Sequence, residues 1–154
     1  DFIRVCMLTG AGVWDGGEFD RGVARELLTA RKLCGAERIK LFCDVDKKHS
    51  VRFPGIDLET HIEWTEFYMA DAIIISGRMT GDAPDIEKVR RAKELSKGRP
   101  ILLGSGTNPE NIGDFFRHAD GCITGFSLKD NGHPWRPVNM DLVKKFMDAA
   151  EKAR

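Results

Sequence analysis

One local pattern occurs five times along the chain: a short apolar run, then a polar or glycine-bearing turn, then a helix-forming stretch. Strands that alternate with helices favour a parallel sheet, because parallel neighbours need a long crossover connection. Both faces of such a sheet are covered, which fits apolar runs without polar alternation. The five runs are Ile3–Leu8, Ile39–Cys43, Ala72–Ile75, Pro100–Leu103 and Gly121–Thr124.

The helices are predicted from apolar residues spaced three and four apart. The spacing predicts helices over about Arg21–Leu33, Asp57–Met69, Pro84–Ser96 and Met140–Ala153, and another that begins at Asn108 with Pro109 in its first turn. Two architectures fit this order: an open doubly wound sheet, or part of an eight-stranded barrel, which usually needs about 250 residues. Residues 1–154 are expected to form one domain.

If the barrel is correct, five βα units cannot close it and about three strands are missing. The first and last strands of the chain then have exposed edges, and exposed edges need a partner or a cover. We therefore expect an oligomer, or a subunit of a larger assembly.

Composition excludes several classes of protein. The chain has 24 basic and 24 acidic residues, so no basic excess indicates nucleic acid as a partner. No apolar run is long enough to cross a membrane, and no targeting peptide is recognisable. The four cysteines lack CxxC or zinc spacing, and we expect no metal and mostly buried free thiols. This predicts a reducing compartment: the cytoplasm, or a mitochondrial or plastid matrix if a targeting segment is missing.

The sharpest local motif follows the fourth apolar run, where two glycines precede the predicted start of a helix. Free amides at such a point bind phosphate, and neighbouring hydroxyl groups can add donors. The next strand leads into a second glycine, which would approach the same ligand. The alternative is a tight turn capped by Asn108, with no ligand. The predicted phosphate-binding residues are Gly104, Ser105, Gly106, Thr107, Gly125 and Phe126.

A second constellation follows the second apolar run. If Leu41 and Cys43 face the helices, alternation along the strand turns Asp44 to the other face, near the mouth of a barrel. Asp44, Lys48 and His49 then form a predicted acid–base set. A lysine here, Lys48 or with less support Lys47, could instead form a Schiff base with a carbonyl substrate. The alternative is a solvated charged loop.

Two further strand ends carry candidate ligand-binding residues. Ser76, Gly77 and Thr80 follow the third run, where a plain loop is an equal alternative. Thr9 and Gly10 follow the first run, and the glycines from Gly10 to Gly17 predict a flexible segment rather than a dinucleotide-binding fingerprint, because GxGxxG is absent. No cofactor is predicted.

The ordered set of these motifs resembles the BtpA family, named for photosystem I biogenesis. The resemblance extends over nearly the whole chain, through Thr9-Gly10, Asp44-Val45, Lys48-His49, Ser76-Gly77, Thr80-Gly81, Gly104-Ser105-Gly106, Pro109-Glu110-Asn111, Gly125, Trp135 and Phe146-Met147. It implies a phosphate-binding (β/α)8 barrel whose members are usually longer than this chain, so that an N-terminal part of about three strands would be absent.

Two functions from different classes remain open at this point. One is an enzyme that binds a small phosphorylated metabolite at the C-terminal rim of the strands and carries out isomerase-, epimerase- or lyase-type acid–base chemistry. The other is a non-catalytic assembly or accessory subunit that uses part of a barrel as a binding module. Both depend on one arrangement, in which Asp44, Ser76 and Ser105 lie at the same edge of the sheet.

Overall fold

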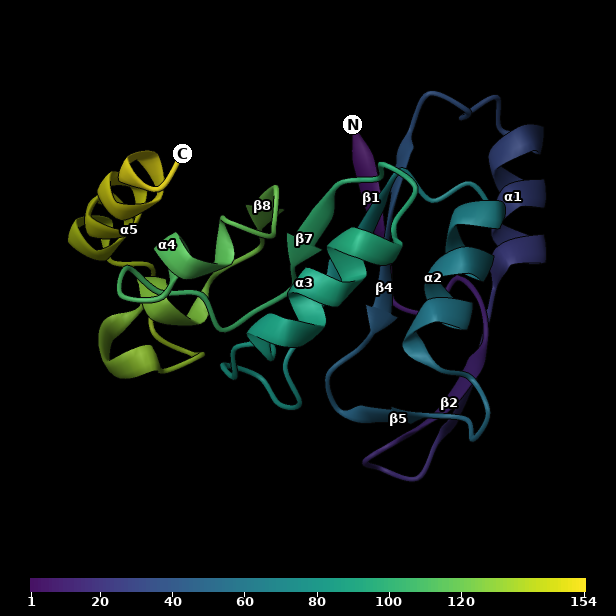
Figure 1. Cartoon of the computed structure of the whole chain (residues 1–154), viewed down its shortest axis with the longest axis horizontal. Coiled ribbons are helices and arrows are strands. Elements are labelled where there is room, and N and C mark those ends of the chain that lie inside the picture. The colour runs from purple at the N-terminus through teal and green to yellow at the C-terminus, as the bar shows by residue number, and fades with distance from the viewer.

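A computed structural model describes residues 1–154 and contains a five-stranded sheet in the order β1-β4-β6-β7-β8. Every neighbouring pair in it is parallel, as predicted. The sheet is an incomplete barrel with two edge strands, β1 and β8, and its strands run towards the β2–β5 region in Figure 1. The strands are β1 (Phe2–Val5), β4 (Lys40–Asp46), β6 (Ala72–Ile75), β7 (Ile101–Leu103) and β8 (Gly121–Cys122).

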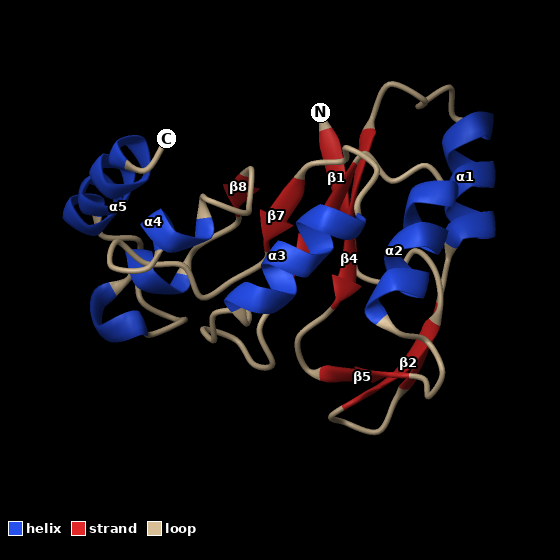
Figure 2. Ribbon diagram, in the orientation of Figure 1, coloured by secondary structure: helices blue, strands red, loops and turns tan.

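The helices follow their strands and cover one face of the sheet (Figure 2). Three of them begin at a polar residue whose side chain accepts a backbone N–H of the first turn: Asp57, Asp85 and Asn139. None of the helices is both long and apolar enough to cross a membrane. They are α1 (Ala24–Leu33), α2 (Leu58–Phe67), α3 (Ile86–Leu95), α4 (Ile112–Phe115) and α5 (Met140–Lys152), with 3₁₀ turns η1 (Phe126–Leu128) and η2 (Asp130–Gly132).

The core lies between the sheet and these helices. Leu41 and Cys43 of β4 are fully buried in it, together with Val89 of α3. Alternation along β4 turns Phe42 and Asp44 to the opposite face, as predicted. That second face carries no helix in Figure 2, and we call it the concave face. Its side chains are available to build a site.

The structure also contains a small antiparallel sheet that we did not predict. It joins β2 (Ala11–Trp14), β3 (Phe19–Arg21) and β5 (Ser50–Arg52) in the order β3-β2-β5. The prediction of a flexible glycine segment at Gly10–Gly17 was wrong, because β2 pairs on both sides. Gly12 allows this close pairing, since a Cβ there would lie 2.8 Å from the Val51 carbonyl oxygen. The small sheet lies beyond the C-terminal end of β4 (Figure 1).

Two local predictions need correction. The helix expected from Asn108 begins only at Ile112 and has four residues. The expectation of mostly buried thiols holds for Cys43 alone, since Cys6 and Cys34 are exposed and Cys122 is half-buried.

Candidate functional site

Four neighbouring strands place one residue each in a single layer of the concave face. The layer contains Arg4 (β1), Asp44 (β4), Ser76 (directly after β6) and Gly104 (directly after β7). The Ser76 hydroxyl donates to Asp44 Oδ1 at 3.5 Å. A Cβ on Gly104 would lie 2.2 Å from the Ser76 Oγ and 3.0 Å from Arg4 Nη2, so glycine is the residue that fits there. The predicted gathering of strand ends at one rim is therefore present.

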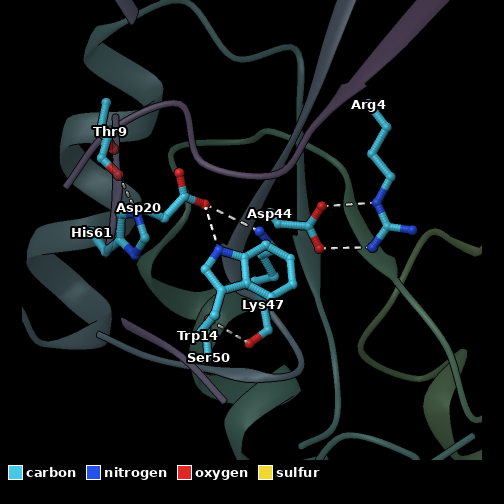
Figure 3. A network of polar contacts seen from close by, with 8 residues as sticks. All are labelled: Arg4, Thr9, Trp14, Asp20, Asp44, Lys47, Ser50 and His61. Atoms are coloured by element: carbon cyan, nitrogen blue, oxygen red, sulfur yellow. Dashed lines mark hydrogen bonds and ion pairs between the residues drawn. The ribbon is translucent and has the colours of Figure 1, made fainter. Parts of the chain in front are cut away.

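Arg4 and Asp44 form the strongest contact of this layer. Arg4 Nε and Nη2 donate to the two Asp44 oxygens, each at 2.8 Å (Figure 3). This fork geometry is stronger than a single hydrogen bond. The Asp44 carboxylate is fully buried while 30% of the Arg4 side chain remains exposed. Hydrogen bonding to Asp44 raises the pKa of Arg4, so the guanidinium stays charged.

An open cleft of about 1210 Å³ lies between the small sheet and the segment that follows β6. Lys47 borders it, with Nζ 3.2 Å from an Asp20 oxygen and 3.2 Å from the centre of the Trp14 ring (Figure 3). The indole N–H of Trp14 donates to the same Asp20 oxygen at 3.1 Å. Of the two lysines considered, Lys47 borders the cleft, whereas Lys48 is half-buried outside its lining.

His49 stands at the wall of the same cleft. Its Nδ1 lies 2.8 Å from an Asp15 carboxylate oxygen, and its Nε2 lies 2.9 Å from the Thr80 hydroxyl. Both ring nitrogens are therefore bound by side chains from other loops. The predicted residues His49 and Thr80 are in direct contact, and Asp15 joins them from the turn between β2 and β3.

The glycine loops after β7 and β8 lie side by side. The hydroxyl groups of Thr124 and Ser127 both donate to the Thr107 carbonyl oxygen, at 3.1 Å and 2.7 Å. The loop after β7 also contacts the loop after β6, because the Gly81 amide donates to Ser105 Oγ at 3.3 Å. Three consecutive strand ends thus share one rim.

The free backbone N–H groups of this rim are its main chemical feature. The amides of Ser105, Gly106 and Thr107 have no acceptor within the chain, and neither have those of Gly125 and Phe126. Buried N–H groups are nearly always paired in folded proteins, so the unpaired amides of the buried residues Ser105 and Thr107 stand out. Loop amides that are free of partners can bind anions, so these five are candidate donors.

The donors do not come from a helix terminus, which corrects the reasoning from the sequence. The Asn108 amide donates to the Asn111 side chain, and the amides of Glu110 and Asn111 donate to the Asn108 side chain. The Thr107 hydroxyl is also buried without a hydrogen-bond partner. The unpaired backbone donors of this rim are therefore loop amides.

The structure places Thr9 and Gly10 away from these residues. The Thr9 hydroxyl contacts the Thr65 hydroxyl of α2 at 2.8 Å, and the Thr9 carbonyl oxygen accepts from His61 Nε2 at 3.0 Å. Both Thr9 and Gly10 border a separate cleft of about 690 Å³ next to α2. Their predicted contact with a common ligand stays a prediction, whereas a structural role for Thr9 is evident.

Comparisons with known proteins identify the family of the chain. The sequence model of the BtpA family matches residues 1–152. The chain belongs to the BtpA family. Within this family, the chain is 41% identical over its whole length to an uncharacterized protein of Methanocaldococcus jannaschii and covers 58% of that protein. It is 36% identical over 96% of its length to the photosystem I biogenesis protein BtpA of Synechocystis and covers 51% of it.

Solved structures of barrel enzymes share the fold. The 3-hexulose-6-phosphate synthase of Salmonella typhimurium superposes with a TM-score of 0.62 at 15% identity, over 100% of this chain and 63% of the synthase. An archaeal fructose-1,6-bisphosphate aldolase gives 0.52 at 16% identity, over 96% of this chain and 56% of the aldolase. At such identities the likeness establishes the TIM-barrel-type α/β fold of this BtpA-family chain and nothing finer.

Reasoning from the sequence missed four residues of the site: Arg4, Trp14, Asp15 and Asp20. Arg4 had a usable signal, because Val5 belongs to the core and Arg4 must then share the face of Asp44. The other three lie on or beside β2 and β3, which the sequence pattern did not reveal.

Proposed function

We propose that this BtpA-family chain binds a small phosphorylated metabolite at the C-terminal rim of its strands and carries out acid–base chemistry beside it. The observation that supports the phosphate subsite is the set of five unpaired amides in the two loops tied together through the Thr107 carbonyl oxygen. Such donors recognise the oxygens of a phosphate group without requiring a lysine or an arginine. Two of the similar structures are named for phosphorylated sugars.

The reacting part of the ligand would lie towards Asp44 and the cleft. Arg4 holds the Asp44 carboxylate in a fixed position, and His49 is an imidazole at the cleft wall. A carboxylate and an imidazole next to a bound sugar phosphate suit proton transfer at a carbon beside a carbonyl group, as in isomerases, epimerases and lyases. Lys48 stays a predicted member of this acid–base set. Lys47 is the alternative amine, because it lines the cleft in which the ligand would lie.

The phosphate subsite can be tested by adding a negative charge to it. A Cβ on Gly125 would meet nothing within 4 Å, and its φ of −162° lies outside the left-handed region, so the side chain of Gly125→Asp has room. Its carboxylate would repel a phosphate group at the neighbouring amides. Gly113→Asp is the matched control, because Gly113 is an exposed glycine of α4 with equal space around it.

Thermal unfolding is measured with and without inorganic phosphate and a panel of sugar phosphates. A ligand selective for the folded state raises the midpoint, and about 100 Kd of ligand adds about 2.7 kcal/mol of apparent stability. We expect this rise in the unmodified chain and in Gly113→Asp, and its loss in Gly125→Asp. An equal rise in all three proteins would contradict the proposed phosphate subsite.

The alternative function, an accessory subunit, is favoured by one feature. β1 and β8 are edge strands of the sheet, and Phe2 of β1 is 55% exposed. Edge strands pair readily with another chain. Light scattering coupled to size exclusion distinguishes the two functions: a folded monomer at micromolar concentration would contradict obligate assembly through these edges.

A further inference from the structure

The small sheet brings Asp15, His49 and Thr80 into one hydrogen-bonded row. We propose that this row is a proton relay in which Asp15 positions His49, and His49 Nε2 accepts the proton that Thr80 transmits from the ligand. The proposal deepens the function proposed above and rests on it for the identity of the ligand. Acid–base chemistry by His49 alone gives Asp15 and Thr80 no function. In the relay, Asp15 positions the imidazole and Thr80 transmits the proton.

The three residues come from three separate connections. Asp15 lies between β2 and β3, His49 between β4 and β5, and Thr80 between β6 and α3. Main-chain bonds hold the connections together: the Asp15 amide donates to the His49 carbonyl at 2.9 Å, and the His49 amide donates to the Arg78 carbonyl at 2.8 Å. The side-chain distances of 2.8 Å and 2.9 Å are thus fixed by backbone contacts on both sides of His49.

The backbone of His49 makes a structural explanation of this residue insufficient. His49 has φ 61°, in the left-handed region where glycine is favoured over every residue with a Cβ. Its contacts with Asp15 are largely solvated, since 58% of the Asp15 side chain is exposed, and solvated pairs contribute little to stability. Backbone strain of this kind is typical of functional sites, and here it occurs at a residue whose two ring nitrogens are both held by hydrogen bonds.

The chemistry follows from which nitrogen carries the hydrogen. A carboxylate only accepts hydrogen bonds, so Asp15 fixes a hydrogen on His49 Nδ1 and leaves a lone pair on Nε2. The Thr80 hydroxyl then donates to Nε2. When the ligand gives a proton to Thr80 Oγ1, the hydroxyl hydrogen of Thr80 passes to Nε2. Thr80 ends unchanged, the ligand carries the electron pair, and the positive charge lies on an imidazolium beside Asp15.

The tautomer of His49 tests this relay without any ligand. Two-bond ¹H–¹⁵N spectra of the uniformly ¹⁵N-labelled chain, taken at a pH where the imidazole is neutral, distinguish a nitrogen that bears hydrogen from a bare one. We expect Nδ1 to bear the hydrogen in the unmodified chain. In Asp15→Ala we expect that preference to be lost, with little change in the midpoint of thermal unfolding because the side chain is mostly exposed.

The matched control is Glu18→Gln, which removes an exposed acid from the same turn and should leave the tautomer unchanged. If Asp15→Ala fails to fold, Asp15→Asn replaces it, and both tautomers should then be populated because an amide can donate as well as accept. A hydrogen on Nε2 in the unmodified chain, or an unchanged tautomer in the folded Asp15 variant, would overturn the relay. Neither result bears on phosphate binding, so failure of the relay and failure of the proposed function are distinguishable.

Discussion

The Arg4–Asp44 pair yields a prediction about stability that depends on which partner is removed. In Arg4→Leu, the carboxylate of Asp44 stays fully buried and keeps only the long 3.5 Å contact with the Ser76 hydroxyl. Breaking a buried pair in this way costs about 3–5 kcal/mol. Since 30% of the Arg4 side chain is exposed, water relaxes part of that cost, and we expect a loss of about 3 kcal/mol.

The reverse replacement, Asp44→Leu, should cost less. The guanidinium that remains already reaches solvent, so we expect a loss of about 1 kcal/mol, and the double variant should lie near the unmodified chain. Thermal unfolding monitored by circular dichroism compares all four proteins, and about 3 kcal/mol corresponds to a midpoint shift of about 6–12 °C in a chain of this size. Equal losses in the two single variants, or losses below about 0.5 kcal/mol in both, would refute the reasoning.

Three further predictions concern buried positions. Burial lowers the pKa of His61, so on acidification the unfolded state binds a proton before the folded state does. Stability should therefore fall as the pH drops below about 6.5, which thermal midpoints measured at a series of pH values would show. A midpoint that does not change with pH below about 6.5 would contradict this. Burial raises the pKa of Cys43 to about 12, so its thiol should react with Ellman's reagent only on unfolding, whereas prompt labelling of Cys43 refutes its burial. Gly104→Ala places a methyl group 2.2 Å from the Ser76 Oγ, so we expect it to lower the free energy of unfolding in urea by about 1–3 kcal/mol. The control Gly113→Ala in α4 should be neutral or stabilising. A larger loss of stability in Gly113→Ala than in Gly104→Ala would contradict the packed layer.

The main sheet could be predicted from sequence because its signal is local and repeated. Each strand is an apolar run, and each run is followed by a helix, so parallel pairing and a common rim follow from topology. The face of Asp44 also followed from alternation with Leu41 and Cys43. A register shift between Asp44 and Asp46 then brings Asp46 opposite Ile75, and the Asp46 carboxylate pairs with Lys88 of α3 at the border of the cleft.

The small sheet was not predicted, because its strands have only three or four residues and because β2 pairs with β5 across a long sequence separation. Trp14 pairs with Ser50, and no local pattern announces that contact. As a result, the contacts of Asp15 with His49 and of Asp20 with Lys47 could not be predicted from the sequence. Whether a backbone amide is free is likewise a three-dimensional property: the side chains of Asn108 and Asn111 accept hydrogen bonds from the amides at the point where the helix was expected to begin.

The central claim is that the paired glycine loops bind phosphate through their backbone amides. Titration of the ¹⁵N-labelled chain with inorganic phosphate, followed by amide chemical shifts, tests it most directly. The account predicts saturable shifts confined to the amides of Ser105, Gly106, Thr107, Gly125 and Phe126 and their immediate neighbours. Shifts that do not saturate, or that saturate at a different surface while these amides stay unchanged, would contradict it.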